Sequence, residues 1–585
     1  MPPDCTLCAG PLRLLHRGAT TGASSAQLAP SCHSPGAHGD LYRCSSCRAV
    51  HQPSLPVGAS LRDAYRGMVD HAYLKEQAGR RATANRLLDL IDTVAPGGER
   101  RAARLLDVGC GHGLLLDEAR RRGYEVEGIE LSAPAATHAR DRLGLRVSET
   151  PLEELGAEED GRWDAVVLAD VLEHLDDPAG ALVRCEALLA PGGTLLVVTP
   201  DPSSAVARLA RARWWGYLPA HAILLPRRVL RELVAATGLV IARDVPFVRT
   251  FSPGYWLAGL AERSPALAPL TRAARRLPSW SRLSLSLGDE RVVAASKVEV
   301  KSPKTPLVRD RGGELKVHVV LPAYEAERTI PQVAAELPVD GADRALLVDD
   351  ASPDDTALLA LREGFEVVRH PVNRGYGANQ MTCYQRSLLD GADVVVMVHA
   401  DNQYDPALIP EMVAPILEGR ADLVIGSRLL RDRAIKGGMP RWKWMGNRLL
   451  TALENRAFRR SFSEYHTGYR AFSAELLRSI AFLRNSDAFV FDQEIFAQTV
   501  ARGARVVEVP IPTRYFLEAS SVSFGRSVVY GLGTLAVLAR FRLDERRGDW
   551  SLLRAPALAS QSTRKRTSAP TASSPSRQVI FLPSA

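Results

Sequence analysis

Residues 104–116 read RLLDVGCGHGLLL and decide the fold of the first half of the chain. An apolar run of strand length leads into three glycines, Gly109, Gly111 and Gly113, and a second apolar run opens a helix. Glycines are needed at such a turn because the backbone bends sharply and a ligand approaches where a Cβ would otherwise stand. We therefore expect a strand, a ligand-binding loop and a helix at the start of a parallel α/β domain.

The residues that follow extend this pattern. The strand EVEGIELS ends in Glu130, 17 residues after Gly113, where a carboxylate can accept hydrogen bonds from a ribose diol. The segments WDAVVLADVLEHLDDP (163–178) and LLAPGGTLLVVTP (188–200) continue the alternation of strands and helices. A dinucleotide site is the competing interpretation of a glycine loop, but here the motif is DVGCGHG instead of GxGxxG.

Together these segments resemble class I S-adenosylmethionine-dependent methyltransferases of the subgroup with an N-terminal zinc ribbon, over about residues 1–245. The resemblance implies a Rossmann-like domain with S-adenosylmethionine as cofactor. By the resemblance, the residues that bind the cofactor are Asp107, Gly109, Gly111, Gly113 and Glu130, with Asp170 facing the same pocket.

Methyl transfer needs a base only where the acceptor must lose a proton. The candidate bases are His174, in LEHL, and His221, in LPAHAILLP; a packing or capping role is the alternative for each. The family acts on small molecules, lipids, sugars, proteins and RNA, so the loop does not name the acceptor.

The cysteines of residues 1–52 form two C-x-x-C pairs, Cys5 with Cys8 and Cys44 with Cys47. Four thiolates can surround Zn²⁺ tetrahedrally, which gives a closed, structural site. The two pairs are further apart than is usual in zinc ribbons, and Cys32 or His33 in the insert could replace one ligand. Unmetallated thiols are the remaining alternative.

The second half begins another α/β alternation with KVHVVLPAYEAERTI (316–330). ALLVDDASPDDT (345–356), HPVNRGYGANQ (370–380), DVVVMVHADNQYDP (393–406) and DLVIGSRLL (422–430) follow. Strands that deliver carboxylates to their C-terminal ends place them where an open α/β sheet binds ligands. An Asp pair near an arginine turn suits a nucleotide, with a metal covering the diphosphate.

This order resembles family 2 glycosyltransferases of the GT-A fold, in the branch similar to dolichyl-phosphate mannosyltransferase, over about residues 315–545. The resemblance implies a nucleotide-sugar donor and a glycan or polyprenyl-phosphate acceptor. The residues that it places around the nucleotide-sugar are Ala323, Tyr324, Glu325, Asp349 and Asp350, with Arg428 and Arg470 near the phosphates.

The same resemblance makes Asp401 the metal-binding residue of a DxD-type motif. His399 stands where the first Asp of that motif usually is, which leaves it either a ligand or a supporting group. We expect Mn²⁺ or Mg²⁺ on Asp401 with Gln403 assisting.

Inverting sugar transfer to a hydroxyl needs a carboxylate to accept the proton, and Asp492 in FVFDQE is the expected base, with Glu494 in reserve. A lipid phosphate acceptor is already anionic and would leave Asp492 an orienting or structural group.

Composition bounds the remaining possibilities. The chain has 585 residues, is 46% hydrophobic and 24% charged, and carries a net charge of +8. Residues 551–585 hold five basic and no acidic residues, and residues 301–316 hold five basic and two acidic ones, so these two segments account for the whole excess. A basic face for nucleic acid is therefore not implied by the net charge.

We expect five segments: a zinc ribbon (1–52), a methyltransferase domain (53–300), a linker (301–314), a glycosyltransferase domain (315–545) and a disordered basic tail (546–585). Without a secretion signal or an apolar run of about 18 residues, we expect a cytoplasmic protein. The apolar stretch 530–541 can lie on the inner face of the membrane, although an ordinary packed helix explains it equally well.

The leading hypothesis is a bifunctional enzyme of cell-surface glycan or glycolipid synthesis. A cofactor-binding scaffold with one inactive domain, or an RNA methyltransferase with an appended domain, is the alternative.

Overall fold

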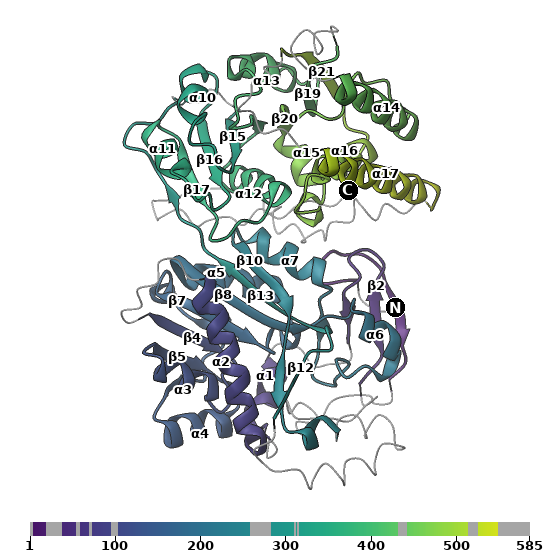
Figure 1. The fold of residues 1–585 in the computed structure, drawn as a ribbon. Coiled ribbons are helices and arrows are strands. Elements are labelled where there is room, and N and C mark those ends of the chain that lie inside the picture. Colours follow the sequence, from purple (N-terminus) through teal and green to yellow (C-terminus); the bar gives the residue numbers. More distant parts are fainter. Residues whose placement is uncertain are drawn as a thin grey trace, which may run out of the picture. The chain divides into compact units, whose positions relative to one another are not determined.

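The computed structural model describes residues 4–18, 38–53, 59–68, 73–94, 103–257, 282–308, 310, 312, 315–430, 441–512 and 524–547. The chain divides into two compact units, Met1–Lys297 and Val298–Ala585 (Figure 1). Each is built around its own sheet and its own buried apolar clusters. The alternative zinc ligands Cys32 and His33 lie outside the described residues, as does the tail from residue 548 onward.

The first unit contains a seven-stranded sheet in the order β10-β13-β8-β7-β4-β5-β6. Its parallel strands are β4 (Arg104–Val108), β5 (Glu125–Ile129), β6 (Arg146–Ser148), β7 (Trp163–Ala169) and β8 (Leu189–Pro200). The sequence predicts a parallel sheet, but β13 (Glu290–Ser296) and β10 (Val240–Pro246) complete it in antiparallel orientation. Seven consecutive buried residues in β13 explain why it lies inside the sheet.

Helices cover this sheet, and a small separate sheet joins the N-terminal segment to it. The helices are α1 (Ala59–Arg66), α2 (Gln77–Val94), α3 (Leu114–Arg121), α4 (Ala133–Leu143), α5 (Pro178–Leu188), α6 (Ala205–Ala210) and α7 (Arg227–Ala236). The small sheet has the order β1-β2-β3-β9, with β1 (Leu12–His16), β2 (Leu41–Cys44), β3 (Val50–His51) and β9 (Ile223–Leu224). A further hairpin pairs β11 (Arg249–Phe251) with β12 (Leu283–Leu285).

The second unit contains an eight-stranded sheet in the order β14-β17-β16-β15-β18-β20-β19-β21. Its strands are β14 (Val300–Lys301), β15 (Val317–Ala323), β16 (Arg344–Asp349), β17 (Glu366–Arg369), β18 (Val394–Met397), β19 (Leu423–Ser427), β20 (Arg470–Ser473) and β21 (Val506–Pro510). Strand β14 and the buried Val308 belong to this unit, so part of the expected linker packs on the second sheet.

The helices of the second unit are α10 (Ile330–Glu336), α11 (Thr356–Arg362), α12 (Tyr376–Leu389), α13 (Ile409–Leu417), α14 (Arg441–Phe458), α15 (Ala474–Ser479), α16 (Phe491–Ala501) and α17 (Phe524–Arg547). Helix α17 buries Val537, Leu538 and Phe541 in the core. No helix among the described residues is long and apolar enough to cross a membrane.

In both sheets the expected site residues follow a central strand. On either side of this strand, the strands are added to the sheet in opposite directions. β4 lies between β5 and β7, and β15 lies between β16 and β18. Connections leave such neighbouring strands in opposite directions, so a crevice opens at their carboxyl ends. The two candidate sites of the chain lie at these two positions.

Candidate functional site

The glycine loop follows β4 as the sequence predicts. Gly109, Gly111 and Gly113 all have positive φ, at 72°, 53° and 78°. A Cβ on Gly109 would stand 2.5 Å from Val171 Cγ2, and one on Gly113 would stand 2.6 Å from Leu145 Cδ1. Side chains are therefore excluded at both positions by conformation and by space.

Glu130 holds this loop from the end of β5. Its Oε2 accepts a hydrogen bond from the Gly111 amide at 2.7 Å, and its Oε1 accepts one from the Ser132 amide at 2.7 Å. Each carboxylate oxygen keeps a second lone pair for a ligand hydroxyl. Burial, and then the neighbouring Glu130 charge, raises the pKa of Asp107 to about 8.

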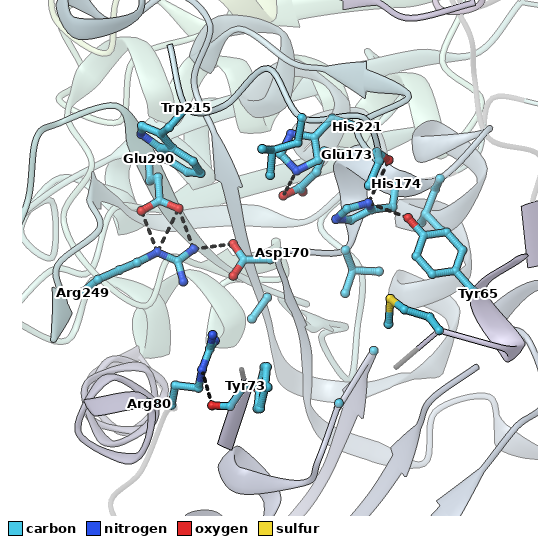
Figure 2. A pocket seen from close by; sticks show the side chains of 18 of the residues that line it. Tyr65, Tyr73, Arg80, Asp170, Glu173, His174, Trp215, His221, Arg249 and Glu290 are labelled. Carbon is cyan, nitrogen blue, oxygen red and sulfur yellow. Dashed lines mark hydrogen bonds and ion pairs between the residues drawn. The ribbon is translucent and has the colours of Figure 1, made fainter. Parts of the chain in front are cut away.

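A cavity of about 580 Å³ opens beside the loop (Figure 2). This volume is within the usual range for a small-molecule site. Of the residues predicted from the sequence, Gly109, Gly111, Glu130, Asp170, His174 and His221 line it, whereas Asp107 and Gly113 are not among its lining residues.

Aromatic rings and a polar network form the rest of the wall, and sequence reasoning missed them. Arg249 Nη2 donates to Asp170 Oδ1 at 2.6 Å, and Arg249 Nε donates to Glu290 Oε2 at 2.7 Å. Asp170 was expected at this pocket, whereas Arg249, Glu290 and the aromatic residues were not. They come from segments without a recognisable motif, so only an excess of aromatic residues in 214–256 could have pointed to them. The aromatic residues of the wall are Tyr65, Tyr73, Trp214, Trp215, Phe247, Phe251, Tyr255 and Trp256.

Two histidines and a glutamate meet in this cavity. The ligand atoms of Glu173, His174 and His221 all lie within 4.8 Å of one another. Thr199 Oγ1 donates to Glu173 Oε2 at 2.9 Å, and His221 Nε2 lies 3.9 Å from Glu173 Oε1. Burial, followed by the charge of Asp170, raises the pKa of Glu173 to about 8. Burial also lowers the pKa of His174 and brings that of His221 to about 3, so both rings are neutral at pH 7.

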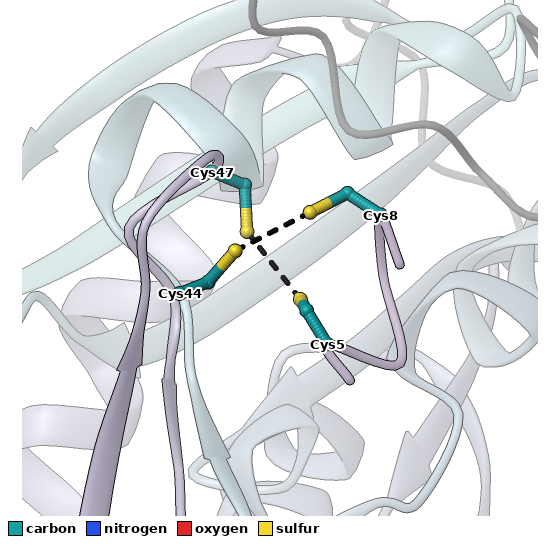
Figure 3. Close-up of side chains that lie close together, drawn as sticks. All are labelled: Cys5, Cys8, Cys44 and Cys47. Carbon is teal, nitrogen blue, oxygen red and sulfur yellow. Dashed lines mark hydrogen bonds between the residues drawn. The ribbon is translucent and has the colours of Figure 1, made fainter. Parts of the chain in front are cut away.

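The four expected cysteines come together in the N-terminal segment (Figure 3). Cys5 Sγ lies 3.6 Å from Cys47 Sγ, and Cys8 Sγ lies 3.4 Å from Cys44 Sγ. All four are free of disulfides and buried. Four thiolates at about 2.3 Å from Zn²⁺ would be separated by roughly 3.8 Å, so the cluster is compatible with zinc.

His51 is a neighbour of this cluster that the sequence did not indicate. Its Nε2 lies 3.1 Å from Cys5 Sγ, and burial lowers its pKa to about 4. A neutral imidazole can donate to the sulfur, which is a common support for a metal ligand.

In the second unit, Asp350 anchors the arginine turn that follows β17. Its two oxygens accept hydrogen bonds from the amides of Arg374 and Gly375 at 2.9 and 2.8 Å. Asp349 lies against Arg369 Nε at 3.1 Å. Of the neighbouring residues expected at the nucleotide, Ala323 is buried at the end of β15, Tyr324 is half exposed, and Glu325 has φ of 51°.

The HADNQ segment follows β18 and lies close to Asp492. The hydroxyl of Tyr376 is 3.1 Å from His399 Nε2 and donates to Asp492 Oδ2 at 3.1 Å. The Gln403 amide donates to Asp401 Oδ1 at 3.2 Å. Between them Asn402 is fully buried with φ of 56°, and its side-chain amide has no hydrogen-bond partner within the described part of the chain.

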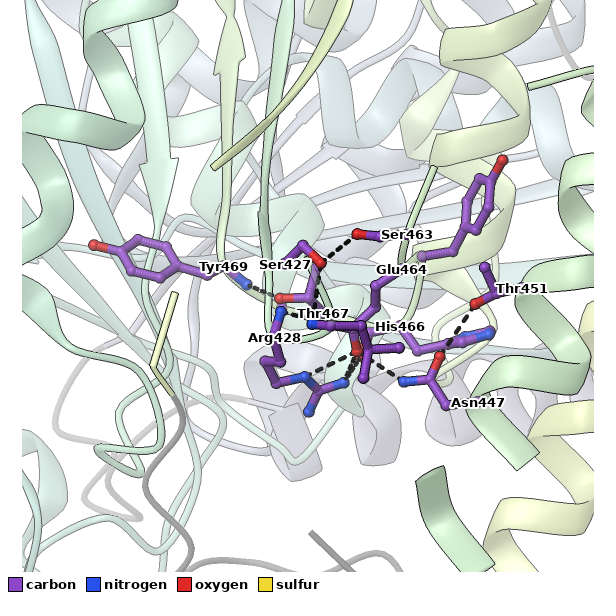
Figure 4. Close-up of polar contacts among 12 residues, drawn as sticks. Ser427, Arg428, Asn447, Thr451, Ser463, Glu464, His466, Thr467 and Tyr469 are labelled. Carbon is purple, nitrogen blue, oxygen red and sulfur yellow. Dashed lines mark hydrogen bonds and ion pairs between the residues drawn. The ribbon is translucent and has the colours of Figure 1, made fainter. Parts of the chain in front are cut away.

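The two arginines expected near phosphates are bound to protein groups. Arg428 Nε donates to Glu464 Oε1 at 2.9 Å, which Asn447 also contacts (Figure 4). Arg470 is buried and donates from Nε to Thr467 O at 2.9 Å and from Nη1 to Asp492 O at 3.0 Å. Their contact with phosphate stays a prediction. Glu494, the reserve base, accepts from the Ser486 amide at 2.6 Å.

Comparisons with known proteins agree with the families expected for the two halves of the chain. A family described as a methyltransferase domain matches residues 78–243, and the family described as glycosyl transferase family 2 matches residues 318–481. The ubiquinone biosynthesis O-methyltransferase of Alkalilimnicola ehrlichii is 41% identical over 117 residues, or 19% of this chain and 47% of the relative. The chain thus spans about half the length of such O-methyltransferases.

Solved structures similar to the chain were also found. Glucosyl-3-phosphoglycerate synthase from Mycobacterium tuberculosis is 21% identical, with 41% of this chain and 82% of the other covered and a TM-score of 0.32. A geranyl diphosphate methyltransferase is 20% identical, with 37% and 77% covered and a TM-score of 0.27.

An uncharacterized protein of Methanocaldococcus jannaschii is 32% identical over 223 residues, which are 38% of this chain and 89% of the archaeal protein. The chain therefore belongs to the family of that protein, and it is a two-domain transferase in which a methyltransferase domain is fused to a family 2 glycosyl transferase domain.

Proposed function

We propose that the first unit transfers a methyl group from S-adenosylmethionine to a sugar, lipid or other small-molecule acceptor. The second unit transfers a sugar, with inversion and with a metal, from a nucleotide-sugar to a polyprenyl phosphate or glycan. The observation that carries this proposal is that each sheet brings its motif residues together at the strand where the order reverses.

The residues of the first unit fit S-adenosylmethionine, which supplies an electrophilic methyl group when bound. The Gly109–Gly111 backbone leaves room that a Cβ would fill, and Glu130 offers acceptors to a ribose. His174 and His221, both neutral, are the candidate acceptors of the proton of an acceptor hydroxyl, and the pKa of about 3 makes His221 the weaker base of the two. Asp170 lines the same cavity beside them.

The acceptor part of the cavity favours a small ring-bearing molecule. Its walls include the indoles of Trp214 and Trp215. The indole N–H groups of both residues donate to Asp289 Oδ2, at 2.8 and 2.5 Å. Trp214 is buried, so the partly exposed Trp215 is the indole that can offer an apolar face to a sugar or to a flat ring. An acceptor of this kind agrees better with an enclosed cavity than RNA does.

In the second unit, we place the nucleotide-sugar over Ala323, Tyr324, Glu325, Asp349 and Asp350. The metal, Mn²⁺ or Mg²⁺, is assigned to Asp401 with Gln403. Among the described residues the side-chain amide of buried Asn402, beside Asp401, has no hydrogen-bond partner, which supports a further ligand at this position. When bound, the metal neutralises the leaving diphosphate.

Asp492 is placed to act on the acceptor. Gln380 and Tyr376 both donate to its carboxylate at 3.1 Å, and Arg470 Nη1 lies 3.5 Å from its Oδ1, so the carboxylate is oriented and paired with a cation. A hydroxyl acceptor would give its proton to this carboxylate, whereas a phosphate acceptor would only be oriented there.

Attachment to the inner face of the membrane is part of the proposal. Helices α14 and α17 expose apolar side chains, with Met445 67%, Leu449 64%, Val529 70% and Leu532 63% exposed. Nearby cations such as Arg448 and Arg540 suit anionic headgroups. A lipid-linked acceptor would then be reached at the membrane surface, in synthesis of a cell-surface glycan or glycolipid.

The methyltransferase assignment is tested by calorimetry with S-adenosylmethionine on the full chain. We expect binding by the wild type and its loss in Gly111→Arg, because the new side chain would meet Tyr73 and occupy the loop. Leu209→Ala, at a side chain 84% exposed, is the matched control. No binding by the wild type would refute the assignment.

The glycosyltransferase assignment is tested by a panel of nucleotide-sugars, with and without a polyprenyl phosphate in anionic vesicles. Release of nucleoside diphosphate should require Mn²⁺ or Mg²⁺ and should fall by at least about 100-fold in Asp401→Ala. Stimulation by the polyprenyl phosphate would identify the acceptor class. Unchanged turnover in Asp401→Ala would exclude the metal role of this residue.

A further inference from the structure

We propose that Glu173, His174 and His221 bind a divalent transition metal in the methyltransferase cavity, and that this metal holds the hydroxyl of the methyl acceptor. The inference rests on the proposed methyl transfer. It changes the expected role of the two histidines from proton acceptors to metal ligands.

The geometry is close to that of a metal site. The ligand atoms of the three side chains lie within 4.8 Å of one another, and Glu173 Oε1 and His221 Nε2 are 3.9 Å apart. Ligands at 2.0–2.2 Å from a tetrahedral Zn²⁺ are separated by roughly 3.4 Å. Small side-chain rotations would therefore bring the three ligand atoms to bonding distance from one ion.

The tautomer of His221 suits a ligand. Its Nδ1 lies 2.7 Å from Gly216 O, and a carbonyl oxygen can only accept, so Nδ1 carries the proton. The lone pair is then on Nε2, the atom that faces Glu173. A ring nitrogen held by a backbone carbonyl is the usual support of a metal-binding histidine.

His174 is held in a similar way. Its Nδ1 lies 2.9 Å from Ala220 O and 2.8 Å from the hydroxyl of Tyr65, which leaves the Nε2 lone pair available. Figure 2 shows the second nitrogen of this ring on the side away from Tyr65.

Glu173 has few protein partners within the described part of the chain. It is 1% exposed, and among the described residues Thr199 is the side chain that donates to it. Within those residues no Lys or Arg forms an ion pair with it, whereas the neighbouring Asp170 and Glu290 share Arg249. A buried carboxyl group that faces two imidazole nitrogens is a donor set that a bound cation would complete.

The chemistry of the three ligands selects the kind of metal. Two imidazoles with one carboxylate suit Zn²⁺, Co²⁺, Fe²⁺ or Mn²⁺ rather than Mg²⁺ or Ca²⁺, which prefer oxygen. Three protein ligands leave a coordination position open, as in catalytic zinc sites. All three line the cavity, so the open position is accessible to an acceptor. A hydroxyl bound there would become more acidic and could release its proton to solvent before its oxygen takes the methyl group, so no separate strong base is needed.

The test counts metal ions on the full chain in the Asp401→Ala background, which removes the expected site of the second unit. After treatment with a chelator and loading with Co²⁺, we expect about two ions per chain, one at the cysteines and one here. The cysteine site shows intense thiolate-to-cobalt absorption, whereas a site of two His and one Glu shows only weak visible bands.

His221→Asn and Glu173→Gln should each lose about one Co²⁺ per chain while keeping the thiolate band. His138→Asn, at a histidine outside the cluster, is the matched control and should lose none. Calorimetry with S-adenosylhomocysteine shows whether each variant is still folded. If one of the two variants does not fold, His174→Asn is measured in its place.

A wild-type count of about one Co²⁺ per chain in this background, or a full count in all three cluster variants, would overturn the proposal. Anomalous diffraction from crystals grown with Zn²⁺ gives a direct reading: a peak among the three side chains supports the site, and its absence refutes it. If the chain fails to bind S-adenosylhomocysteine, the methyltransferase proposal is refuted. The metal proposal is tested separately, because the number of bound Co²⁺ ions does not depend on S-adenosylhomocysteine.

Discussion

At the scale of single residues, His399 shows how a departure from a familiar motif is accommodated. It occupies the position where an Asp was expected, and its ring packs against Tyr376 and Tyr404 with centroids 5.7 and 5.2 Å away. The Tyr376 hydroxyl has one proton, which it donates to Asp492, so His399 Nε2 must donate in turn to the phenolic oxygen. Any metal bound by His399 would therefore be bound through Nδ1.

The substitution Gly468→Ala tests whether sugar transfer depends on the position of the His399 ring. A Cβ on Gly468 would stand 2.1 Å from His399 Nε2, so the ring must move by about 1 Å, and a shift of that size can cost about 100-fold in rate. We expect sugar transfer to fall by about 10- to 100-fold with the fold retained, measured as nucleoside diphosphate release.

Gly446→Ala on α14 is the control, because a Cβ there meets no atom of the described residues within 4 Å. Equal turnover of Gly468→Ala and Gly446→Ala would show that the position of His399 does not affect the reaction.

At the scale of elements, the cysteine-bearing segment is connected to the methyltransferase cavity. Its strand β3 pairs with β9, which begins two residues after His221. The side chain of buried Gln52 donates to Pro219 O at 3.0 Å and to His221 O at 3.3 Å. The segment therefore holds the loop that carries His221, so a metal ion that bound the cysteines would also act on the cavity.

Gln52→Ala should loosen that loop without removing the cysteines. Loss of the amide leaves buried carbonyls unpaired, at a cost of about 1–3 kcal/mol. We expect faster hydrogen exchange in residues 217–224 and methyl transfer reduced by about tenfold. The control is Gln332→Ala, at an exposed glutamine of α10. Unchanged exchange in residues 217–224 would contradict a holding role for Gln52.

At the scale of the whole molecule, the chain is two transferases with separate cores. Its buried clusters each belong to one unit, and the division falls between Lys297 and Val298. Ligands of one domain should therefore stabilise that domain alone.

Calorimetric unfolding of the full chain should show two transitions. S-adenosylhomocysteine at 100 times its Kd stabilises the first unit by about 2.7 kcal/mol and should raise one transition by roughly 5–10 °C. A nucleoside diphosphate with Mn²⁺ should raise the other. A single transition that shifts with both ligands would mean that the two units unfold together.

Local motifs predicted both domain families, the glycine loop and the four-cysteine cluster. The glycine loop and each C-x-x-C pair depend on residues a few positions apart, so they are visible in the sequence even though the two cysteine pairs are 36 positions apart. Other features need residues far apart in the chain. Glu173 meets His221 across 48 positions, Asp170 meets Arg249 across 79, and Gln52 reaches His221 across 169. Only the folded sheets bring such groups together, because the strand order that makes them neighbours is set by packing of the whole core and by no local pattern.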